Sequence, residues 1–296
     1  MVDINRGTQG VALPPEVAAE IWQPIQENSQ VMRLAQQTPL PGGGVEVEII
    51  TGDAEAEFVA ETEEKPVSRP SLDSRLMRGY TIATIVPFSN QFRRDKQRLY
   101  NALVSRLPLA LARRFDRAVL LGEGAPSAAD FDTLADIPAV DVSTPRSGFL
   151  EAMQSVATTP DEETGGDVTG WLLSTAGELI AMGADDTTAR PLLIDDIQTE
   201  GSIGSIYARP VFRSRTVADA ATRTVGYGGD WRSAHWGQVE GVTVSISDQA
   251  TLTDGGETIN LWQRNMFAVR AEIEVGFRVR EEGHFVRLTG DLNGGS

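Results

Sequence analysis

The sequence predicts an α+β fold in which one domain is inserted into another. From Phe267 to Val279 every second residue is apolar and the residues between are mostly polar, which is typical of a long strand with one buried face. One long segment, residues 89–121, follows helical spacing and can cover that face. Residues 145–252 lie between these two segments and mix short helical and strand patterns, which indicates a compact α+β insertion.

The composition excludes several classes of protein. The chain has 296 residues, 41% of them hydrophobic and 23% charged, which is enough for one or two domains with a sizeable core. Its 42 acidic and 26 basic residues give a formal net charge of -16, so phosphate backbones and anionic lipid surfaces repel it. It contains no cysteine, which excludes disulfides and thiolate sites. We expect neither a signal peptide nor a membrane-spanning helix.

The first 44 residues predict an arm followed by a short helix. Residues 1–13 are mostly polar and contain glycine, which is typical of a chain end that packs weakly on its own domain. Pro14 and Pro15 then open a helix over residues 16–22, because proline is tolerated in a first helical turn. Pro41 and the three glycines that follow it predict a turn.

Residues 45–86 predict a hairpin that projects from its domain. Val45 and Val47 alternate with glutamates in the first strand, and a second alternating pattern over residues 76–86 marks the returning strand. The connecting residues 53–74 are rich in charge and offer little to bury. Because a two-stranded arm of this kind is unstable alone, we expect another molecule to stabilise it. The alternative is a disordered acidic loop in a monomer.

The helix predicted over residues 89–121 has Ser89 as a suitable N-cap and Gly122 as a stop. Pro108 lies inside it and should kink it, because proline removes a hydrogen bond and collides with the preceding turn. Arginines line the face opposite the apolar one: Arg93, Arg94, Arg98, Arg106, Arg113, Arg114 and Arg117. Such a row can contact DNA or a partner, but the acidic net charge favours a solvated face that pairs with the acidic hairpin of this or a neighbouring subunit.

No pattern predicts an ordinary enzyme. The two histidines, His235 and His284, have no companion at metal-ligand spacing, and a surface or partly buried structural role is the simpler interpretation. No serine lies in a nucleophile elbow, and the glycines at 42–44 lack the Lys-Ser/Thr of a phosphate loop. The acidic pairs at 185–186 and 195–196 match no cation-binding loop, so we interpret them as solvated loop acids. We expect no cofactor and no metal.

Four segments carry a resemblance to a known family. They are residues 229–231 (GDW), 236–244 (WGQVEGVTV), 265–272 (NMFAVRAE) and 284–288 (HFVRL). Together with the order of the predicted elements, they resemble the major capsid protein of tailed bacteriophages of the Hong Kong 97 type. The resemblance implies a named set of parts: an N-arm and short helix (residues 1–44), an extended E-loop hairpin (45–86), a peripheral domain (87–144 and 253–296) with a long spine helix (89–121) and a long strand (265–280), and an inserted axial α+β domain (145–252). One departure is Ala208-Arg209, where the family often has a glycine before Pro-Val.

The resemblance implies a shell protein that is not an enzyme. It would assemble into hexamers and pentamers of an icosahedral head that encloses double-stranded DNA, and the virion would be assembled in the cytoplasm of a host bacterium. The implied partners are copies of itself, a portal protein and separate scaffolding or decoration proteins, with DNA contacted only non-specifically and no membrane. Because the arm begins at Met1, we expect a separate scaffolding protein or none. Two alternatives stay open: an encapsulin-type bacterial nanocompartment shell, and a monomeric α+β binding or hydrolytic protein.

The resemblance also implies one possible covalent step, a single-turnover isopeptide bond between subunits. In the type member an E-loop lysine attacks an asparagine side chain and a glutamate acts as base. Here Asn265 and Glu272 occupy the matching positions, and Lys65 lies near the middle of the E-loop. The attacking amine must be neutral, so burial under a neighbour's arm has to lower the lysine pKa from about 10.4. Alternatively no cross-link forms, and Glu272 pairs with Arg270, Arg278 or a neighbour. The presence of Lys65 in a chain with only one other lysine counts toward cross-linking, and both alternatives stay open.

Overall fold

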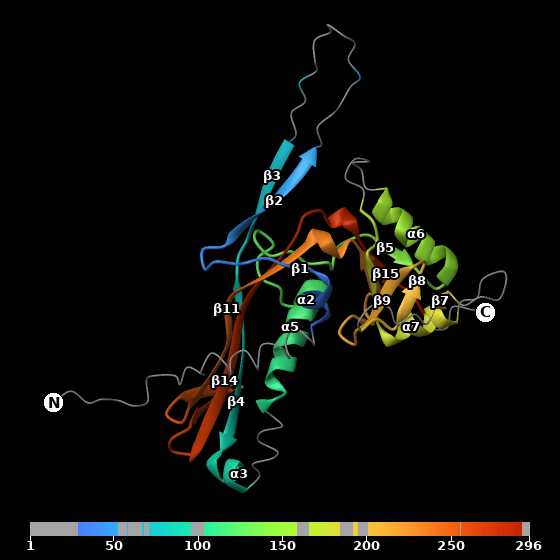
Figure 1. The fold of residues 1–296 in the computed structure, drawn as a ribbon. Helices are drawn as coiled ribbons and strands as arrows, with labels where there is room; N and C mark the ends of the chain where they lie inside the picture. The colour runs from blue at the N-terminus through green and yellow to red at the C-terminus, as the bar shows by residue number, and fades with distance from the viewer. Residues whose placement is uncertain are drawn as a thin grey trace.

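The computed structural model describes residues 29–52, 58, 67, 71–95, 104–158, 166–183, 192–194, 201–254 and 256–291. It contains a long four-stranded sheet, a seven-stranded sheet to one side of it, and a hairpin, β2–β3, that extends beyond one end of the long sheet (Figure 1). The fold is α+β, as predicted. The arm predicted over residues 1–13 and the helix predicted over residues 16–22 lie outside the described residues.

Strand β14 (Met266–Val279) confirms the long strand predicted over residues 265–280. It lies between two antiparallel partners, β11 (Ala234–Ser247) and β4 (Tyr80–Ser89), and β11 also pairs with β1 (Gln36–Gln37). Every odd-numbered residue of β14 from 267 to 279 is buried. Between them, charged residues at 270, 272 and 274 stay accessible on the other face, as the alternation of side chains along a strand requires.

Helix α5 (Leu107–Leu121) covers the buried face of the long sheet. Leu111, Phe115 and Val119 recur every four residues and belong to the same buried cluster as the odd-numbered residues of β14. The Phe115 and Phe277 rings meet edge to face, with centroids 6.4 Å apart. Each buried side chain of this size stabilises the fold by about 1.5–3 kcal/mol. Gly122 ends the helix with a φ of 67°, which confirms the predicted stop.

The helix predicted over residues 89–121 is interrupted in the structure. Helix α3 (Asn90–Asp95) follows β4, residues 96–103 lie outside the described residues, and a turn at Ser105 and Arg106 precedes α5. Pro108 stands in the first turn of α5, so the predicted kink at this residue is wrong. A proline at that position starts a helix, because its missing N–H has no partner within a first turn anyway.

The hairpin is shorter than the one predicted over residues 45–86. Strand β2 (Val45–Gly52) pairs with β3 (Ser71–Met77), and the chain then continues into β4, which pairs with β14 in the long sheet. The returning strand therefore ends at Met77, although the alternating pattern continues beyond it. Gly79 lets the chain pass close to β11, because a Cβ at this position would lie 2.4 Å from Val239 Cγ2. The apolar cluster at the base of the hairpin is small, with three buried members: Leu40, Val47 and Met77.

The second sheet has the strand order β5-β15-β10-β6-β9-β8-β7, and helices α6 (Pro145–Ala157) and α7 (Thr175–Met182) pack on it. Its strands are β5 (Ala139–Asp141), β6 (Gly170–Leu173), β7 (Leu193–Ile194), β8 (Gly204–Ile206), β9 (Arg209–Arg213), β10 (Thr224–Gly229) and β15 (Phe285–Thr289). Phe149 of α6 and Trp171 of β6 are fully buried and meet edge to face. Both helices lie within the predicted insertion, residues 145–252.

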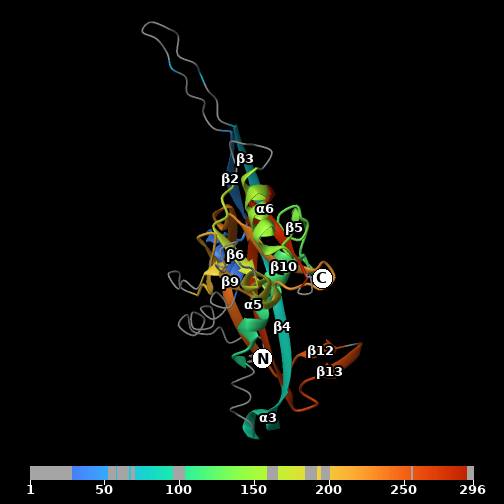
Figure 2. The same cartoon turned by 90° about the vertical axis from the view of Figure 1, so that its right-hand side faces the viewer.

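The predicted insertion, residues 145–252, does not coincide with the segments that form the second sheet. β5 and β15 come from the flanking segments, predicted over residues 87–144 and 253–296, yet they join the second sheet. β11 pairs with β14 instead, and β12 (Thr251–Asp254) forms a separate hairpin with β13 (Glu257–Asn260) near α3 (Figure 2). Strand partners are set by side chains that are distant in sequence, so a boundary drawn from local patterns misses these exchanges.

Three short elements complete the described structure: α2 (Gln30–Leu34), and the 3₁₀ turns η1 (Trp231–Ser233) and η2 (Glu282–His284). Helix α2 joins the buried cluster around α5 through Val31 and Met32. Within the described residues, no helix is long and apolar enough to cross a membrane.

Candidate functional site

The three residues predicted to link subunits lie in different settings. Lys65 lies outside the described residues, Asn265 stands just before β14, and Glu272 lies in the middle of that strand. A strand advances by about 3.3 Å per residue, so the six steps from Met266 to Glu272 span roughly 20 Å. One chain therefore does not bring its own Asn265 and Glu272 together.

Asn265 is held in a fixed, exposed position in the turn that precedes β14. Its φ is 53°, a left-handed conformation that asparagine adopts more readily than most residues. The backbone carbonyl of Asn265 accepts a hydrogen bond from the Asn90 N–H at 3.2 Å, and its side-chain Oδ1 accepts one from Asn90 Nδ2 at 3.0 Å. The neighbouring Trp262 is 69% exposed. The turn thus presents a carboxamide whose oxygen is already hydrogen-bonded beside an exposed aromatic ring.

Glu272 is paired within its own chain. Its Oε1 accepts a hydrogen bond from Thr243 Oγ1 at 3.1 Å and lies 3.1 Å from Arg270 Nη2, and the side chain is 29% exposed. The pairing with Arg270 is one of those expected if Glu272 has a structural role. The other intrachain candidate, Arg278, is instead bound to Asp132. Glu272 keeps a carboxylate on the accessible face of the sheet, where a second molecule can approach it.

A cluster of charges at the root of the hairpin was not predicted from the sequence. Asp132, which follows α5, accepts hydrogen bonds from Arg278 Nη1 and from the Val279 N–H, each at 2.8 Å. Both side chains of the Arg278–Asp132 ion pair are 8% exposed. Arg75 of β3 also approaches Asp132, at 4.0 Å. The loop after α5 thereby fixes one end of the hairpin to the long sheet.

Asp130 makes a second contact to the same root. Its carboxylate lies 3.7 Å from Arg78 Nε and accepts a hydrogen bond from the Tyr80 hydroxyl. That hydrogen bond raises the pKa of Tyr80. The sequence offers only a weak signal for this cluster, the pattern Asp130-Phe131-Asp132 in a turn-rich segment. Together the two aspartates hold β3 and the start of β4, so they determine the direction in which the hairpin leaves the body.

A buried carboxyl ties the start of the described chain to α5. Asp116 accepts hydrogen bonds from Ser29 Oγ at 2.6 Å and from the Gln30 N–H at 3.2 Å, while Ser29 Oγ caps α2 by accepting from the Met32 N–H. Burial raises the pKa of Asp116 to about 7, although these hydrogen bonds act in the opposite direction. Ser29, where the described chain begins, is therefore anchored to α5.

The structure gives His235 a structural setting, and His284 lies partly buried in η2. His235 is buried, and its Nδ1 lies 3.0 Å from Thr38 Oγ1. Burial lowers its pKa to about 4, so it is neutral at physiological pH. Among the described residues no group of acidic or histidine side chains is arranged to hold a metal ion. The acidic pairs 185–186 and 195–196 lie outside the described residues.

The predicted arginine row is exposed where the structure describes it. Arg106, Arg113, Arg114 and Arg117 all lie on the accessible face of α5 or just before it. Arg117 pairs with Glu123, and Arg114 donates to the Gly124 carbonyl at 3.3 Å. Within the described part of the chain, Arg113 and Arg114 form no ion pair. The Arg113 guanidinium and the remaining N–H groups of Arg114 can therefore meet an acidic partner.

Comparison with known proteins gives consistent results. The phage capsid family matches residues 9–290. The chain is 32% identical over 291 residues to the "Probable major capsid protein gp17" of Mycobacterium phage L5, covering 94% of this chain and 89% of the relative. It is 30% identical over 296 residues to the protein of the same name in Mycobacterium phage D29, covering 96% and 91%. Among solved structures, a chain of Gordonia phage Cozz superposes with a TM-score of 0.71 at 20% identity, covering 89% of this chain and 86% of that one.

Proposed function

The chain belongs to the phage capsid family and is a major capsid protein of a tailed bacteriophage, and we propose that it builds the phage head as hexamers and pentamers of itself. The observation that carries this assembly mode is the β2–β3 hairpin, which extends beyond the long sheet with a buried cluster of three residues at its base. An isolated two-stranded hairpin has marginal stability in water, so contacts with a neighbouring subunit are needed to hold it. Each subunit would lay its hairpin on the next one.

Charge supports the same arrangement. The hairpin connection contains six acidic residues: Asp53, Glu55, Glu57, Glu61, Glu63 and Glu64. The exposed arginines of α5 offer a complementary surface, and such complementarity guides association and fixes register more than it adds affinity. We propose that the acidic net charge also keeps packaged DNA from adhering to the shell, so that DNA is contacted only non-specifically. A portal protein and separate scaffolding or decoration proteins would complete the particle.

We further propose a covalent link between subunits. The neutral amine of Lys65 on one subunit would attack Cγ of Asn265 on a second, forming the Nζ–Cγ bond. The Cγ–Nδ2 bond then breaks, ammonia leaves, and an isopeptide bond remains. A carboxylate would take the proton from the attacking nitrogen and deliver it to the departing one. Because Met266, the residue after Asn265, already lies roughly 20 Å along the strand from Glu272, the Glu272 that serves this role must come from another copy.

Asn90 is positioned to stabilise the oxyanion that forms in this reaction. Its Nδ2 donates to Asn265 Oδ1 at 3.0 Å, and that oxygen becomes negatively charged when the amine adds to Cγ. A donor already aimed at a developing oxyanion lowers the barrier, because no reorganisation is needed during the reaction. The exposed Trp262 ring can exclude water from one side of the lysine stem, which favours the neutral amine.

Electron microscopy of the purified, expressed chain tests the shell, and boiling in detergent tests the linkage. Closed particles built from rings of five and six subunits are expected, whereas a monodisperse monomer would refute the assembly. After boiling, a ladder above the 31.9 kDa subunit together with a mass loss of one ammonia per link supports cross-linking. A single band at that mass refutes it and leaves the shell intact. The nanocompartment alternative predicts particles loaded with cargo enzymes, and the relatives named above are instead phage major capsid proteins.

A further inference from the structure

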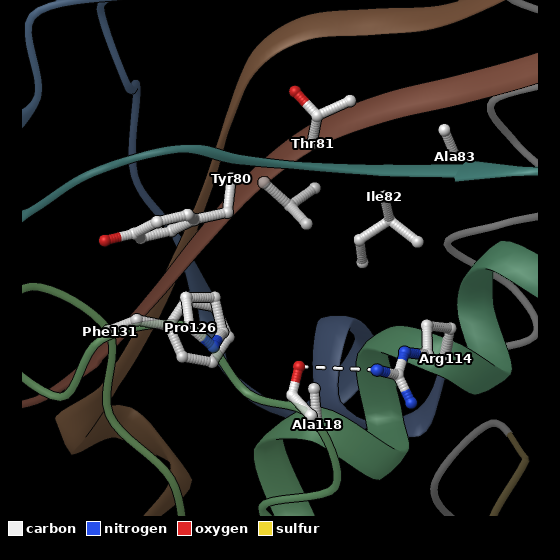
Figure 3. A pocket seen from close by; sticks show the side chains of 10 residues that line it. Tyr80, Thr81, Ile82, Ala83, Arg114, Ala118, Pro126 and Phe131 are labelled. Atoms are coloured by element: carbon white, nitrogen blue, oxygen red, sulfur yellow. Dashed lines mark hydrogen bonds between the residues drawn. The ribbon is translucent and has the colours of Figure 1, made fainter.

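A cavity of about 330 Å³ lies between β4, α5 and the loop that follows α5 (Figure 3). Tyr80 and Ile82 point into it from β4, and Phe131 closes it from the loop. Pro126, Ala118 and Val275 supply further apolar lining, and Arg114 of α5 stands at its edge. A cavity of roughly 150 Å³ with apolar walls is already enough to hold a benzene ring. The site is therefore large enough for an aromatic side chain.

The cavity lies between α5 and β4, which is the edge strand of the long sheet. Four consecutive residues of this strand, 80–83, contribute to its lining, although their side chains alternate between the two faces of the sheet. Ile82 points toward α5, whereas Thr81 and Ala83 point to the opposite side of the strand (Figure 3). β4 is the last strand of the four-stranded sheet and has no further strand beside it in the described structure. An extended segment of another chain can therefore lie along this edge and turn a side chain into the cavity.

Phe58 is a large apolar side chain that its own chain does not cover. It lies in the hairpin connection, six residues beyond the end of β2, and it is fully exposed. The residues immediately before it are Asp53, Glu55 and Glu57, alternating with alanines. A phenylalanine that stays in water lacks the stabilisation that burial of its ring would give. An apolar residue beside a row of acids matches an apolar cavity with an arginine at its edge.

We propose that Phe58 of one subunit occupies the Tyr80–Ile82–Phe131 cavity of a neighbouring subunit, with the acidic residues before it facing Arg114 and Arg113 of α5. The inference rests on the proposed shell function and specifies where the hairpin of one copy is held on the next. Because Phe58 is fully exposed in its own chain, the occupant comes from a second copy. The contact would combine a buried aromatic anchor with a charged rim, as in interfaces where a few residues dominate binding.

Photo-crosslinking tests the proposal without assuming where Phe58 lies. Phe58 is replaced by p-benzoylphenylalanine, which keeps an aromatic ring, and particles are assembled from a mixture of isotope-labelled and unlabelled chains. After irradiation, crosslinked peptides are identified by mass spectrometry. We expect crosslinks to residues 80–83, 114–118 or 124–131, joining labelled to unlabelled chains. Crosslinks that map elsewhere, or that join residues of one chain only, would overturn the proposal.

Two side-chain truncations distinguish a specific contact of Phe58 from the general effect of removing an exposed apolar side chain. Phe58→Ala should raise the subunit concentration needed for assembly about tenfold or more, since an aromatic anchor is lost. Leu150→Ala removes another half-exposed apolar side chain, on α6, and should leave that concentration unchanged within about twofold. Equal effects of the two truncations would overturn the proposal. If the unaltered chain forms no particles, both this proposal and the proposed function fail, whereas particles with Phe58 crosslinked elsewhere contradict only this one.

Discussion

Replacing Asp132 by alanine tests the charge cluster at the hairpin root. The substitution leaves the Arg278 guanidinium 8% exposed without its carboxylate, and it removes the acceptor of the Val279 N–H. Arg278 would keep only its hydrogen bonds to the Ala129 and Ala128 carbonyls, at 2.9 and 3.4 Å. Removing one partner of a buried ion pair costs about 3–5 kcal/mol, because the remaining charge stays desolvated. The free energy of unfolding, measured by urea titration of unassembled subunits, should fall by about that amount.

A surface pair of similar geometry provides the matched control. Arg209 and Asp167 approach to 2.8 Å, like Arg278 and Asp132, but their side chains are 34% and 57% exposed. Asp167→Ala should therefore cost about 1 kcal/mol or less. The double variant Asp132→Leu/Arg278→Met removes both buried charges and should recover most of the loss. A loss for Asp132→Ala no greater than that for Asp167→Ala would refute the idea that desolvation of Arg278 is decisive.

The remaining predictions concern linkage and pH. Lys65→Arg and Asn265→Asp should each abolish the detergent-resistant ladder, whereas Lys96→Arg should leave it unchanged; a ladder that survives Lys65→Arg contradicts the assignment. Asn90→Ala should slow ladder formation by roughly 10- to 100-fold in a time course of assembled particles, because the oxyanion loses a donor, and an unchanged rate would remove Asn90 from the mechanism. Asp116 has a folded-state pKa of about 7, above its unfolded value of about 3.9, so it contributes stability at low pH that is lost as pH rises toward and through 7. Denaturation of unassembled Asp116→Asn subunits between pH 5 and pH 8 should show a smaller decline with rising pH than the unaltered chain, and parallel declines would contradict the assignment.

The sequence was most informative where side-chain periodicity decides the structure. Strand β14 follows from strict alternation, because only a two-residue repeat places all its odd-numbered residues on one covered face. The end of α5 follows from Gly122, since a glycine adopts the left-handed conformation without strain. Both features are local, so the residues that specify them lie within a few positions of one another.

The sequence was least informative where distant strands compete for partners. Alternation over residues 76–86 is the same whether β4 completes the hairpin or pairs with β14, and local pattern does not distinguish the two. Local pattern also does not show that β5 and β15 join the second sheet, or that β11 joins the long sheet. Within the candidate site, Asn265 and Glu272 were found through a family resemblance, whereas Asp130 and Asp132 could not be found without knowing that the loop after α5 meets the hairpin.

Strand β14 has a mechanical consequence for a shell. Its fourteen residues form a beam of roughly 45 Å, with the Asn265 turn at one end and the Arg278–Asp132 cluster at the other. A beam held by hydrogen bonds along both sides tilts as a unit, so lifting the end beside the hairpin root must displace the Asn265 end as well. Neighbouring subunits that contact opposite ends of β14 would therefore be mechanically coupled. A change in shell curvature at one ring of subunits would displace the subunits of the next ring.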